Sequence, residues 1–557
     1  MPKYVLGFLV PGLLLLLLAA VVSNAQWEHL AGRGTGTLAW GPSLFRIMLA
    51  LHGSVLTWLA NRASGGRLST SSHPSAGTAA RTWWILGGLM LASLGLRLWR
   101  LESSLWLDEV LTMVDFARSP VGIILTSFPN QNQHMLYSLL AHLSLVTFGE
   151  SAWALRLPAV AFGVASLWAL FLLGRTVVGT RESLLACGLM AVSYHHIWFS
   201  QNARGYTGVL LFATLATWLW LEARNRHRLR WWLGYAAACF LGLWIHSTMI
   251  FLIAAHGLMY LLGLTRPGSP ERRAGWMPWA AWALCATVTL QALSLALPEF
   301  LRQAIHEVSP PSEWRNPMWM IAESMRSLKV GFSGGVALLC AGLLFLIGWV
   351  RILKHHTHAA MIMTLPGLLG GAVVLATSHN LWPRFFFFSM GFALLVVVHG
   401  AVEAPKLASS WLPAGSRLWA QRTGLALAGV MIVASAATVP RCYRLPKQDY
   451  TGARDYVERN RTQKDIVITA GLANHAYSRY YAPQWPPIGN VAELKQWVQT
   501  CPTLYLVFTL PAELKGFHPE LWAVINTQFR TVQVFPGSLG GGEIYVSRLR
   551  KQPASQQ

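Results

Sequence analysis

The chain has 557 residues, of which 54% are hydrophobic and only 12% are charged. This composition excludes an ordinary soluble globular protein and predicts a polytopic α-helical membrane protein, because its long apolar runs exceed what a soluble core can bury. The formal net charge of +22 does not indicate a nucleic-acid partner. Lys and Arg lie mostly in short loops between apolar segments, where they orient the chain in a membrane, and no basic run is interleaved with aromatic residues.

We expect about 13 transmembrane helices, because that many segments approach the roughly 20 apolar residues that a bilayer requires. The first segment follows Lys3 and ends near Ser23; it is predicted to be an uncleaved anchor, with a cleaved secretory signal as the alternative. The predicted spans are residues 4–22, 42–60, 82–99, 156–174, 183–200, 206–223, 231–246, 248–264, 276–297, 331–350, 359–377, 384–401 and 422–440.

Basic residues indicate how these spans are oriented. With the N-terminus in the cytoplasm, the inner loops hold most of the basic side chains, as the positive-inside rule requires. These are Arg62, Arg67 and Arg81, Arg175 and Arg181, the runs 223–230 and 266–273, Arg351 and Lys354, and the loop 402–421. The loops 100–155 and 298–330, the turns 193–206 and 378–385 and residues 441–557 then lie outside. We therefore predict a multi-pass protein of the cytoplasmic (inner) membrane whose C-terminal domain is extracytoplasmic.

Three regions follow from this orientation. Residues 1–80 hold two extra N-terminal spans, residues 81–440 form the catalytic core, and residues 441–557 form a separate domain. Within the outer loop 100–155, residues 134–148 are apolar but short for a span, and they are predicted to form a helix at the membrane interface.

The C-terminal region is predicted to be a small α/β domain. Its expected strands are residues 465–470, 502–508 and 543–549, and its expected helices are residues 453–460, 490–499 and 519–529. The run SLGGGE (538–543) is predicted to be a turn and not a phosphate-binding loop, since no P-loop lysine follows it. Cys442 and Cys501 lie on the same oxidising side and could form a disulfide.

The acidic pair Asp108-Glu109 follows directly on an apolar segment in a chain with only 22 acidic residues. Carboxylates at the mouth of a span are costly and usually functional, so both are candidates for a general base or a metal ligand. The alternative is a solvated interfacial pair, or charge at a helix N-terminus. No cofactor is certain from the sequence, and a divalent metal is possible.

Three arginines lie on the same predicted side. Arg204, Arg384 and Arg156 are candidates for holding the phosphate of a donor, because a guanidinium fork matches two phosphate oxygens. The alternative for each is an arginine that snorkels to lipid headgroups. For Arg156, an ion pair with Glu150 is the favoured interpretation.

Histidines and a tyrosine complete the set of candidate substrate-binding residues: His134, Tyr206 and His196. Adjacent helical residues such as His195 and His196 point apart, so they are not expected to ligate one metal ion together. Structural or hydrogen-bonding roles are favoured for the histidines, and packing is the alternative for Tyr206.

These groups predict sugar transfer from a lipid-linked phosphate. An outer carboxylate removes a proton from an acceptor hydroxyl, and cationic groups neutralise the departing phosphate, so that the leaving group needs no protonation. The donor must arrive through the membrane, because nucleotide sugars remain cytosolic.

Four stretches of the sequence resemble the GT-C glycosyltransferases, in particular glycosyltransferase family 39, which includes the protein O-mannosyltransferases and the aminoarabinose transferase of lipid A. They are LWLDEVLT, QHMLYSLLAHLSLVTFGESAWALRLPAV, SYHHIWFSQNARGYT and WPRFFFF. The resemblance implies an inverting transferase that uses a polyprenyl-phosphate sugar, with Asp108 as base or key acid and with Arg204 and Arg384 near the donor phosphate. Two departures stand out. The acidic motif follows the third span and not the first, and His134-Met135-Leu136 replaces the usual His-Pro-Pro.

Other readings of the sequence remain open. An oligosaccharide transferase is the alternative within the same class, and a flippase of a lipid-linked sugar or a non-catalytic membrane scaffold subunit are alternatives outside it. The acceptor is a glycan, a lipid or a protein, and residues 441–557 could bind it or contact a protein partner. Membrane lipids are expected to surround the core.

Overall fold

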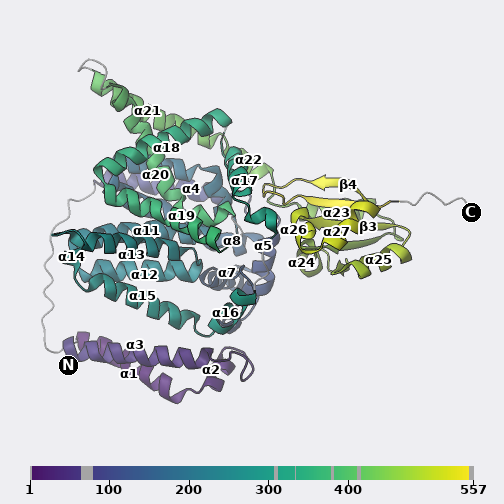
Figure 1. The fold of residues 1–557 in the computed structure, drawn as a ribbon, viewed down its shortest axis with the longest axis horizontal. Coiled ribbons are helices and arrows are strands. Elements are labelled where there is room, and N and C mark those ends of the chain that lie inside the picture. The colour runs from purple at the N-terminus through teal and green to yellow at the C-terminus, as the bar shows by residue number, and fades with distance from the viewer. Residues whose placement is uncertain are drawn as a thin grey trace, which may run out of the picture.

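The computed structural model describes residues 3–63, 79–306, 311–332, 334–377, 382–409 and 416–550. A helical body carries a smaller domain with a β-sheet at one of its ends (Figure 1). Among the features of the sequence analysis, Arg67, the first part of the turn 378–385, parts of the loops 298–330 and 402–421 and the end of the region 441–557 lie outside the described residues.

Each predicted span falls on a helix. These helices are α1 (Lys3–Val21), α3 (Gly41–Ala63), α4 (Ala80–Leu98), α8 (Ala152–Val177), α9 (Thr180–Ala191), α11 (Tyr206–Arg226), α12 (Leu229–Ile245), α13 (Met249–Leu264), α15 (Met277–Leu293), α18 (Gly335–His355), α19 (Thr357–Ala376), α20 (Met390–Ser409) and α21 (Ser416–Ala436). By length and composition, 7 helices of the described chain can cross a membrane, or up to 9 if each bent pair is one span. The chain is thus a polytopic helical membrane protein.

Helices α8 and α11 form the centre of the helical body. They are the most buried candidate spans: 67% of the most apolar 18-residue stretch of α8 and 83% of that of α11 are buried inside the protein. Small residues allow neighbouring helices to approach these two closely: a Cβ at Gly163 of α8 would overlap the side chain of Ser200, and one at Gly208 of α11 would overlap Ile245 of α12. Helices without a hydrophobic driving force between them pack through such small residues.

The predicted span 183–200 is two helices, α9 and α10 (Tyr194–Ser200), and buried Arg97 explains the break. Its guanidinium donates to the carbonyl oxygens of Ala191 (3.0 Å) and Met190 (3.3 Å) at the end of α9. It also donates to Ser200 Oγ (3.1 Å) and contacts His196 Nδ1 (2.5 Å) on α10. A cation that binds the last carbonyls of a helix stabilises its C-terminus. The chain can therefore turn here and start α10, which contacts the sheet domain through Trp198 and Ser538.

The N-terminal pair α1 and α3 forms a hairpin along one side of the helical body (Figure 1). The two helices touch at glycines, since a Cβ at Gly12 would lie 3.0 Å from the carbonyl oxygen of Gly53. The short helix α2 (Asn24–Leu30) connects them. The hairpin meets the body at Gly41, where a Cβ would lie 2.8 Å from the carbonyl oxygen of Ser294. That residues 1–80 are an addition to the core stays a prediction.

The predicted interfacial helix is α7 (Met135–Phe148). One part of it is buried in the body, at Tyr137 and Ala141, whereas Val146 and Phe148 are 72% and 53% exposed. Its apolar exposed side suits contact with lipid.

The C-terminal domain contains a five-stranded mixed sheet with the order β2-β1-β3-β5-β4. The three predicted strands are β1 (Ile466–Ala470), β3 (Leu504–Thr509) and β5 (Ile544–Leu549), and the predicted helices are α23 (Tyr450–Asn460), α25 (Val491–Thr500) and α27 (Pro519–Gln528). The structure adds β2 (Pro487–Ile488), the edge strand β4 (Phe529–Phe535), α24 (Ala473–Ala476), the π-helical turn η4 (Tyr477–Tyr481) and α26 (Pro511–Phe517). The possible disulfide does not form, because Cys442 and Cys501 are both free.

The sheet domain packs directly on one end of the helical body (Figure 1). One of its two hydrophobic cores includes Leu107, Trp314 and Trp382 from the body together with Tyr450 and Val507 from the domain. The glycine-rich turn before β5 also lies at this boundary. A Cβ at Gly540 would overlap Arg326 of α17 (Pro317–Val330), and one at Gly537 would overlap the carbonyl oxygen of Lys447. These glycines therefore permit close docking of the domain.

Candidate active site

The acidic pair lies in the first turn of α5 (Leu107–Leu111), a short helix that continues into the π-helix η1 (Thr112–Ala117). Trp106 is the N-cap residue of α5, and its backbone N–H donates to Glu109 Oε2 (3.3 Å). Negative charge in the first turn of a helix is favourable, because unpaired N–H groups gather there. Both acids are nonetheless withdrawn from solvent: Asp108 is 7% exposed and Glu109 is fully buried.

The structure brings Asp108 together with two of the three predicted arginines. Its Oδ2 lies 3.3 Å from Arg384 Nη1 and 4.0 Å from Arg204 Nε. Arg384 comes from the 3-10 turn η3 (Pro383–Ser389), and Arg204 comes from the turn between α10 and α11. One carboxylate thus lies between two guanidinium groups, so this small region has an excess of positive charge.

Three buried donors in this region lack a hydrogen-bond acceptor among the described residues: Arg204 Nε, Arg384 Nε and Asn202 Nδ2. The amide oxygen of Asn202 accepts from Trp106 Nε1 (3.0 Å), which leaves its amide nitrogen free. Buried polar groups normally have partners, and each exception requires an explanation. Three adjacent donors without acceptors indicate a site for a ligand rich in oxygen.

Glu109 differs from Asp108 because hydrogen-bond donors surround its carboxylate. It accepts from Arg156 at both oxygens (2.7 and 2.6 Å), from the Ala203 N–H (2.8 Å) and from Lys447 Nζ (3.4 Å). Burial alone would raise the pKa of Glu109, but Arg156 and then Lys447 outweigh it and lower the pKa to about 2. These donors hold the carboxylate at the start of α5, so Glu109 anchors this helix, and its role as a base stays a prediction.

Arg156 likewise has a structural role. Besides Glu109, its guanidinium donates to the carbonyl oxygens of Leu101 and Ser103 (both 2.7 Å) and of Ser104 (3.0 Å), and it is fully buried. The predicted ion pair with Glu150 is wrong, because Glu150 binds Arg118 (2.5 Å) instead. Since none of its nitrogens is free, the structure does not support Arg156 as a phosphate ligand.

His134 and Tyr206 lie beside Arg204. The rings of His134 and Tyr206 make an edge contact at 5.8 Å between centroids, and Arg204 lies 6.0 Å from the Tyr206 centroid. Burial, followed by the charge of Arg204, lowers the pKa of His134 well below its usual range, so the imidazole is neutral. Its Nδ1 donates to the Ile245 carbonyl (3.0 Å), and its Nε2 has no partner among the described residues. Nε2 can therefore accept a hydrogen bond from a hydroxyl.

His196, a candidate substrate-binding residue for which a structural role is favoured, lies among buried side chains. It is fully buried, it contacts Arg97, and its ring stacks on Phe387. Its neighbour His195 lines the adjoining cavity and holds the Ser327 carbonyl at 2.9 Å. The two rings point apart, as expected for adjacent helical residues, and a structural role follows for His196.

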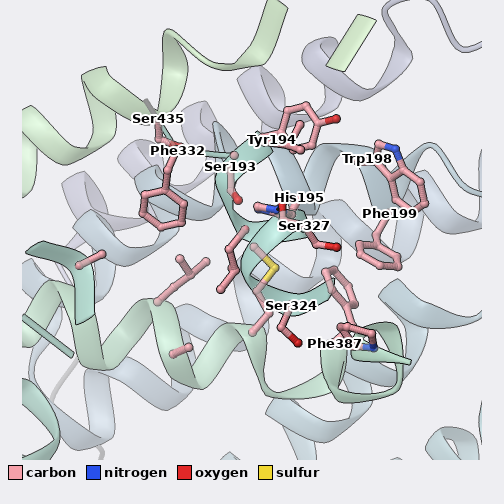
Figure 2. A pocket seen from close by; sticks show the side chains of 18 of the residues that line it. Ser193, Tyr194, His195, Trp198, Phe199, Ser324, Ser327, Phe332, Phe387 and Ser435 are labelled. Carbon is pink, nitrogen blue, oxygen red and sulfur yellow. The ribbon is translucent and has the colours of Figure 1, made fainter. Parts of the chain in front are cut away.

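A cavity of about 640 Å³ begins beside the arginine cluster. Trp106, Asn202 and Arg384 line its polar end, and apolar side chains of α9, α18, α20 and α21 line the remainder, among them Leu189, Leu344, Val397 and Met431. Figure 2 shows the rings of Phe199 and Phe387 on one side of this space and Phe332 on another, with His195 and Ser327 between them. The cavity thus joins a cationic mouth to a long apolar interior.

The C-terminal domain contributes to both ends of the site. Ser538, Leu539 and Gly540 line the large cavity, and Ser538 Oγ accepts from Trp198 Nε1 (2.9 Å). Lys447 lines a second cavity of about 440 Å³, which also borders Trp198. Burial lowers the pKa of Lys447 to about 7, although Glu109 opposes this effect. The run 538–543 was predicted only as a turn, and Lys447 was not singled out, since nothing in the pattern around it differs from an ordinary surface loop.

Among the described residues, no group of three or more His, Cys, Asp and Glu side chains is placed to hold a metal ion. Asn202 lies inside the SQNARGY stretch that drew attention to Arg204, so a search for hydrogen-bonding side chains in that turn would have found it.

The helical body, Asp108 and its two arginines together define a polytopic helical membrane protein with a charged site at one end of the body. Residues 132–293, which run from the residues before α7 to the end of α15, match the family model described as dolichyl-phosphate-mannose-protein mannosyltransferase. This match covers less than a third of the chain, and over these residues the chain is similar to that family. No curated protein matches the chain by sequence.

The chain is similar to several solved structures at low identity, and one of them has a TM-score above 0.5. ArnT from Cupriavidus metallidurans in the apo state has a TM-score of 0.51 and 14% identity, and the match covers 84% of this chain and 98% of that one. For the same protein bound to undecaprenyl phosphate, the TM-score is 0.49 and the identity is 13%, and the match covers 84% of this chain and 98% of that one. The oligosaccharyltransferase AglB from Archaeoglobus fulgidus was solved in complex with an inhibitory peptide and a dolichol-phosphate. Its TM-score is 0.49 and its identity is 12%, and the match covers 86% of this chain and 75% of that one.

Proposed function

We propose that the enzyme transfers a sugar from a polyprenyl-phosphate donor to an acceptor hydroxyl on the extracytoplasmic side of the membrane, with inversion at the anomeric carbon. The observation that carries this proposal is the set of unpaired buried donors at Asn202, Arg204 and Arg384 around Asp108. The family's description names a polyprenyl-phosphate sugar of the dolichyl type as donor.

Arg204 and Arg384 are proposed to bind the donor phosphate. Each has a free Nε–H, and together with Asn202 they can donate to several phosphate oxygens at once. Hydrogen bonds between charged groups of this kind are about twice as strong as neutral ones. Because Arg384 touches both Asp108 and the cavity, it joins the acid to the place where the phosphate would lie.

Asp108 is proposed to act as the general base. The acceptor oxygen bonds to the anomeric carbon, the bond from that carbon to the phosphate oxygen breaks, and the acceptor proton moves to the Asp108 carboxylate. The electron pair of the broken bond remains on the phosphate, where the two arginines neutralise the charge that develops. His134 Nε2 and Tyr206 lie near enough to Arg204 to contact the sugar.

The apolar part of the large cavity is proposed to hold the first isoprene units of the donor. Its volume of about 640 Å³ is within the range of ligand sites in proteins, and the remainder of the chain would extend into lipid. A flippase would instead require broken helices and polar groups near the middle of the membrane. Here α10 contacts the sheet domain through Trp198 and Ser538, and α5, which carries Asp108, lies at the end of the body next to that domain (Figure 1).

We further propose that all 13 predicted spans cross the membrane, with the N-terminus inside and the sheet domain outside. The shorter helices α12 and α13 are apolar, with 17 and 16 residues, and they pack beside the central helices. Two pairs of charged side chains join segments that are predicted to lie at the inner side. Arg351 pairs with Glu403 (2.7 Å), and His399 pairs with Glu182 (2.6 Å).

The decisive experiment is transfer in vitro by the purified protein, with a panel of polyprenyl-phosphate sugars and candidate acceptors, next to Asp108→Asn and Arg384→Ala variants. We expect Asp108→Asn to lose transfer by about 10²-fold or more at unchanged thermal stability, and Arg384→Ala to lose donor binding as well. An Asp108→Asn protein as active as the unmodified enzyme would refute the assignment of the base. A scaffold role would predict the same result for both variants, namely no effect on function.

A further inference from the structure

Residues 445–449 connect the last membrane helix region to the C-terminal domain, and they pass directly beside α5. We propose that Gln448 is a positioning residue for Asp108, and that through Gln448 the sheet domain helps to set the geometry of the catalytic site. This inference rests on the proposed function, in which Asp108 is the base. It goes beyond it by giving the C-terminal domain a role other than acceptor binding or stabilisation.

The first link is a hydrogen bond at the start of α5. The backbone N–H of Leu107 donates to Gln448 Oε1 (3.0 Å). First-turn N–H groups of a helix have no partner within the helix, so an acceptor from outside determines how the helix begins. Leu107 directly precedes Asp108, and the orientation of this peptide therefore controls where the carboxylate lies.

The second link fixes the amide of Gln448 in turn. Its Nε2 donates to Thr509 Oγ1 (3.2 Å) at the end of β3 and to the carbonyl oxygen of Gly542 (3.2 Å) before β5. Thr509 Oγ1 itself donates to the Glu543 carbonyl (2.9 Å). Gln448 is fully buried, so no water competes for these bonds. The sheet thus orients the oxygen that receives the Leu107 N–H.

Two flanking contacts from the same domain support this arrangement. The hydroxyl of Tyr481 donates to the Leu105 carbonyl (2.7 Å), and Lys447 Nζ reaches Glu109 (3.4 Å). Residues 105–109 are therefore held at three points by the sheet domain and on the other side by Arg156. A base displaced by about 1 Å can lose about 10²-fold in rate, which is why such a frame matters for a short helix.

The test compares Gln448→Met with Thr509→Val in steady-state transfer by the full-length enzyme, with a polyprenyl-phosphate sugar that the unmodified enzyme accepts. Methionine has a similar length but accepts no strong hydrogen bond from Leu107. We expect kcat to fall roughly 10-fold, while KM for the donor and the melting temperature change little. Thr509→Val removes only the hydroxyl that orients the amide, so it should lower kcat in the same direction by a smaller factor. Gln496→Ala, at an exposed position of α25 in the same domain, is the matched control and should leave kcat unchanged.

The outcomes separate this inference from the function on which it rests. Absent transfer in the unmodified enzyme with every donor would refute the proposed function. Inactive Asp108→Asn beside a fully active Gln448→Met would refute the positioning role alone. A parallel loss of kcat, donor affinity and melting temperature in both Gln448→Met and Thr509→Val would show general unfolding of the boundary and would also overturn the proposal.

Discussion

Glu109 accepts hydrogen bonds from Arg156, Ala203 and Trp106, whereas its neighbour Asp108 faces Arg384 and Arg204 beside the cavity. Glu109 and Arg156 both have side chains with no exposed surface. Removing one partner of a buried pair leaves an uncompensated charge and costs about 3–5 kcal/mol. The two acids should therefore respond differently to the same amide substitution.

We predict that Glu109→Gln lowers the melting temperature of the purified protein by several degrees, while Asp108→Asn leaves it nearly unchanged and lowers kcat. Thermal unfolding in detergent followed by tryptophan fluorescence measures the first effect, and the transfer assay measures the second. Equal melting temperatures for Glu109→Gln and the unmodified protein would contradict the role of Glu109 as an anchor.

The stabilising effect of Glu109 should also depend on pH. Its pKa is about 2 in the folded protein and about 4.5 ordinarily, so the unfolded chain binds the extra proton first as the pH falls. The contribution, about 3 kcal/mol from this difference, is complete above pH 4.5 and disappears as the pH approaches 2. The gap in melting temperature between the unmodified protein and Glu109→Gln should therefore narrow between pH 6 and pH 3. A gap that stays constant over this interval would show that the ionised carboxylate is not its source.

Arg384 offers a test of phosphate recognition at a single residue. Lysine keeps the positive charge at this position but lacks the Nε–H and the planar fork that could bind two oxygens. We predict that Arg384→Lys raises KM for the polyprenyl-phosphate sugar about 10-fold, since one charge-assisted hydrogen bond contributes about 1.5–3 kcal/mol. Arg459→Lys, on α23 of the sheet domain, is the matched control. An unchanged KM for Arg384→Lys would remove the fork from donor binding.

At the scale of elements, the turn before β5 matters because it lies against the linker that carries Lys447 and Gln448. We predict that Gly537→Ala lowers both kcat and the melting temperature, because its Cβ would overlap the backbone of Lys447, and overpacking of this kind costs about 1–3 kcal/mol. Gly489→Ala in the same domain is the control, since its Cβ would meet nothing closer than 3.8 Å. If Gly537→Ala behaved like Gly489→Ala, the close docking of this turn would be unimportant.

The elements themselves show how far the sequence can lead. Apolar length sufficed to place every predicted span on a helix, because a membrane span is a local property of about 20 residues. The break at residues 192–193 could not be found in this way, since it depends on Arg97, which lies far away in the sequence. Strand β4 was missed for another reason: most of it is exposed at the edge of the sheet, so it shows little hydrophobic signal.

The site was predictable to a similar extent. Asp108, Arg204 and Arg384 could be singled out because charged residues at the ends of apolar segments are rare and costly. The roles of Glu109 and Arg156 could not be separated from them, because both acids and all three arginines carry the same local signal. Gln448 and Lys447 carry no signal at all, since only the docking of the sheet domain brings them to α5.

At the scale of the whole molecule, the charged contacts gather at two opposite ends of the helical body. The predicted inner loops bind one another, as Arg224 pairs with Glu271, which also lies 3.8 Å from His358. The acid and its arginines lie with the sheet domain, whereas α14 (Pro270–Ala274) lies at the opposite end of the body (Figure 1). The pattern of basic loops predicts that the end with α14 faces the cytoplasm.

Reporter fusions test this orientation directly. We predict that alkaline phosphatase is active when fused after Arg118 or after Arg550, and that green fluorescent protein is bright when fused after His227, in the turn between α11 and α12. The physical reason is that the basic run 223–230 resists translocation, which places α5 and the sheet domain on the other side. The reciprocal fusions at each position are the controls and should be silent. Phosphatase activity after His227, or fluorescence after Arg550, would place Asp108 on the cytoplasmic side and would remove the reason for a donor delivered through the membrane.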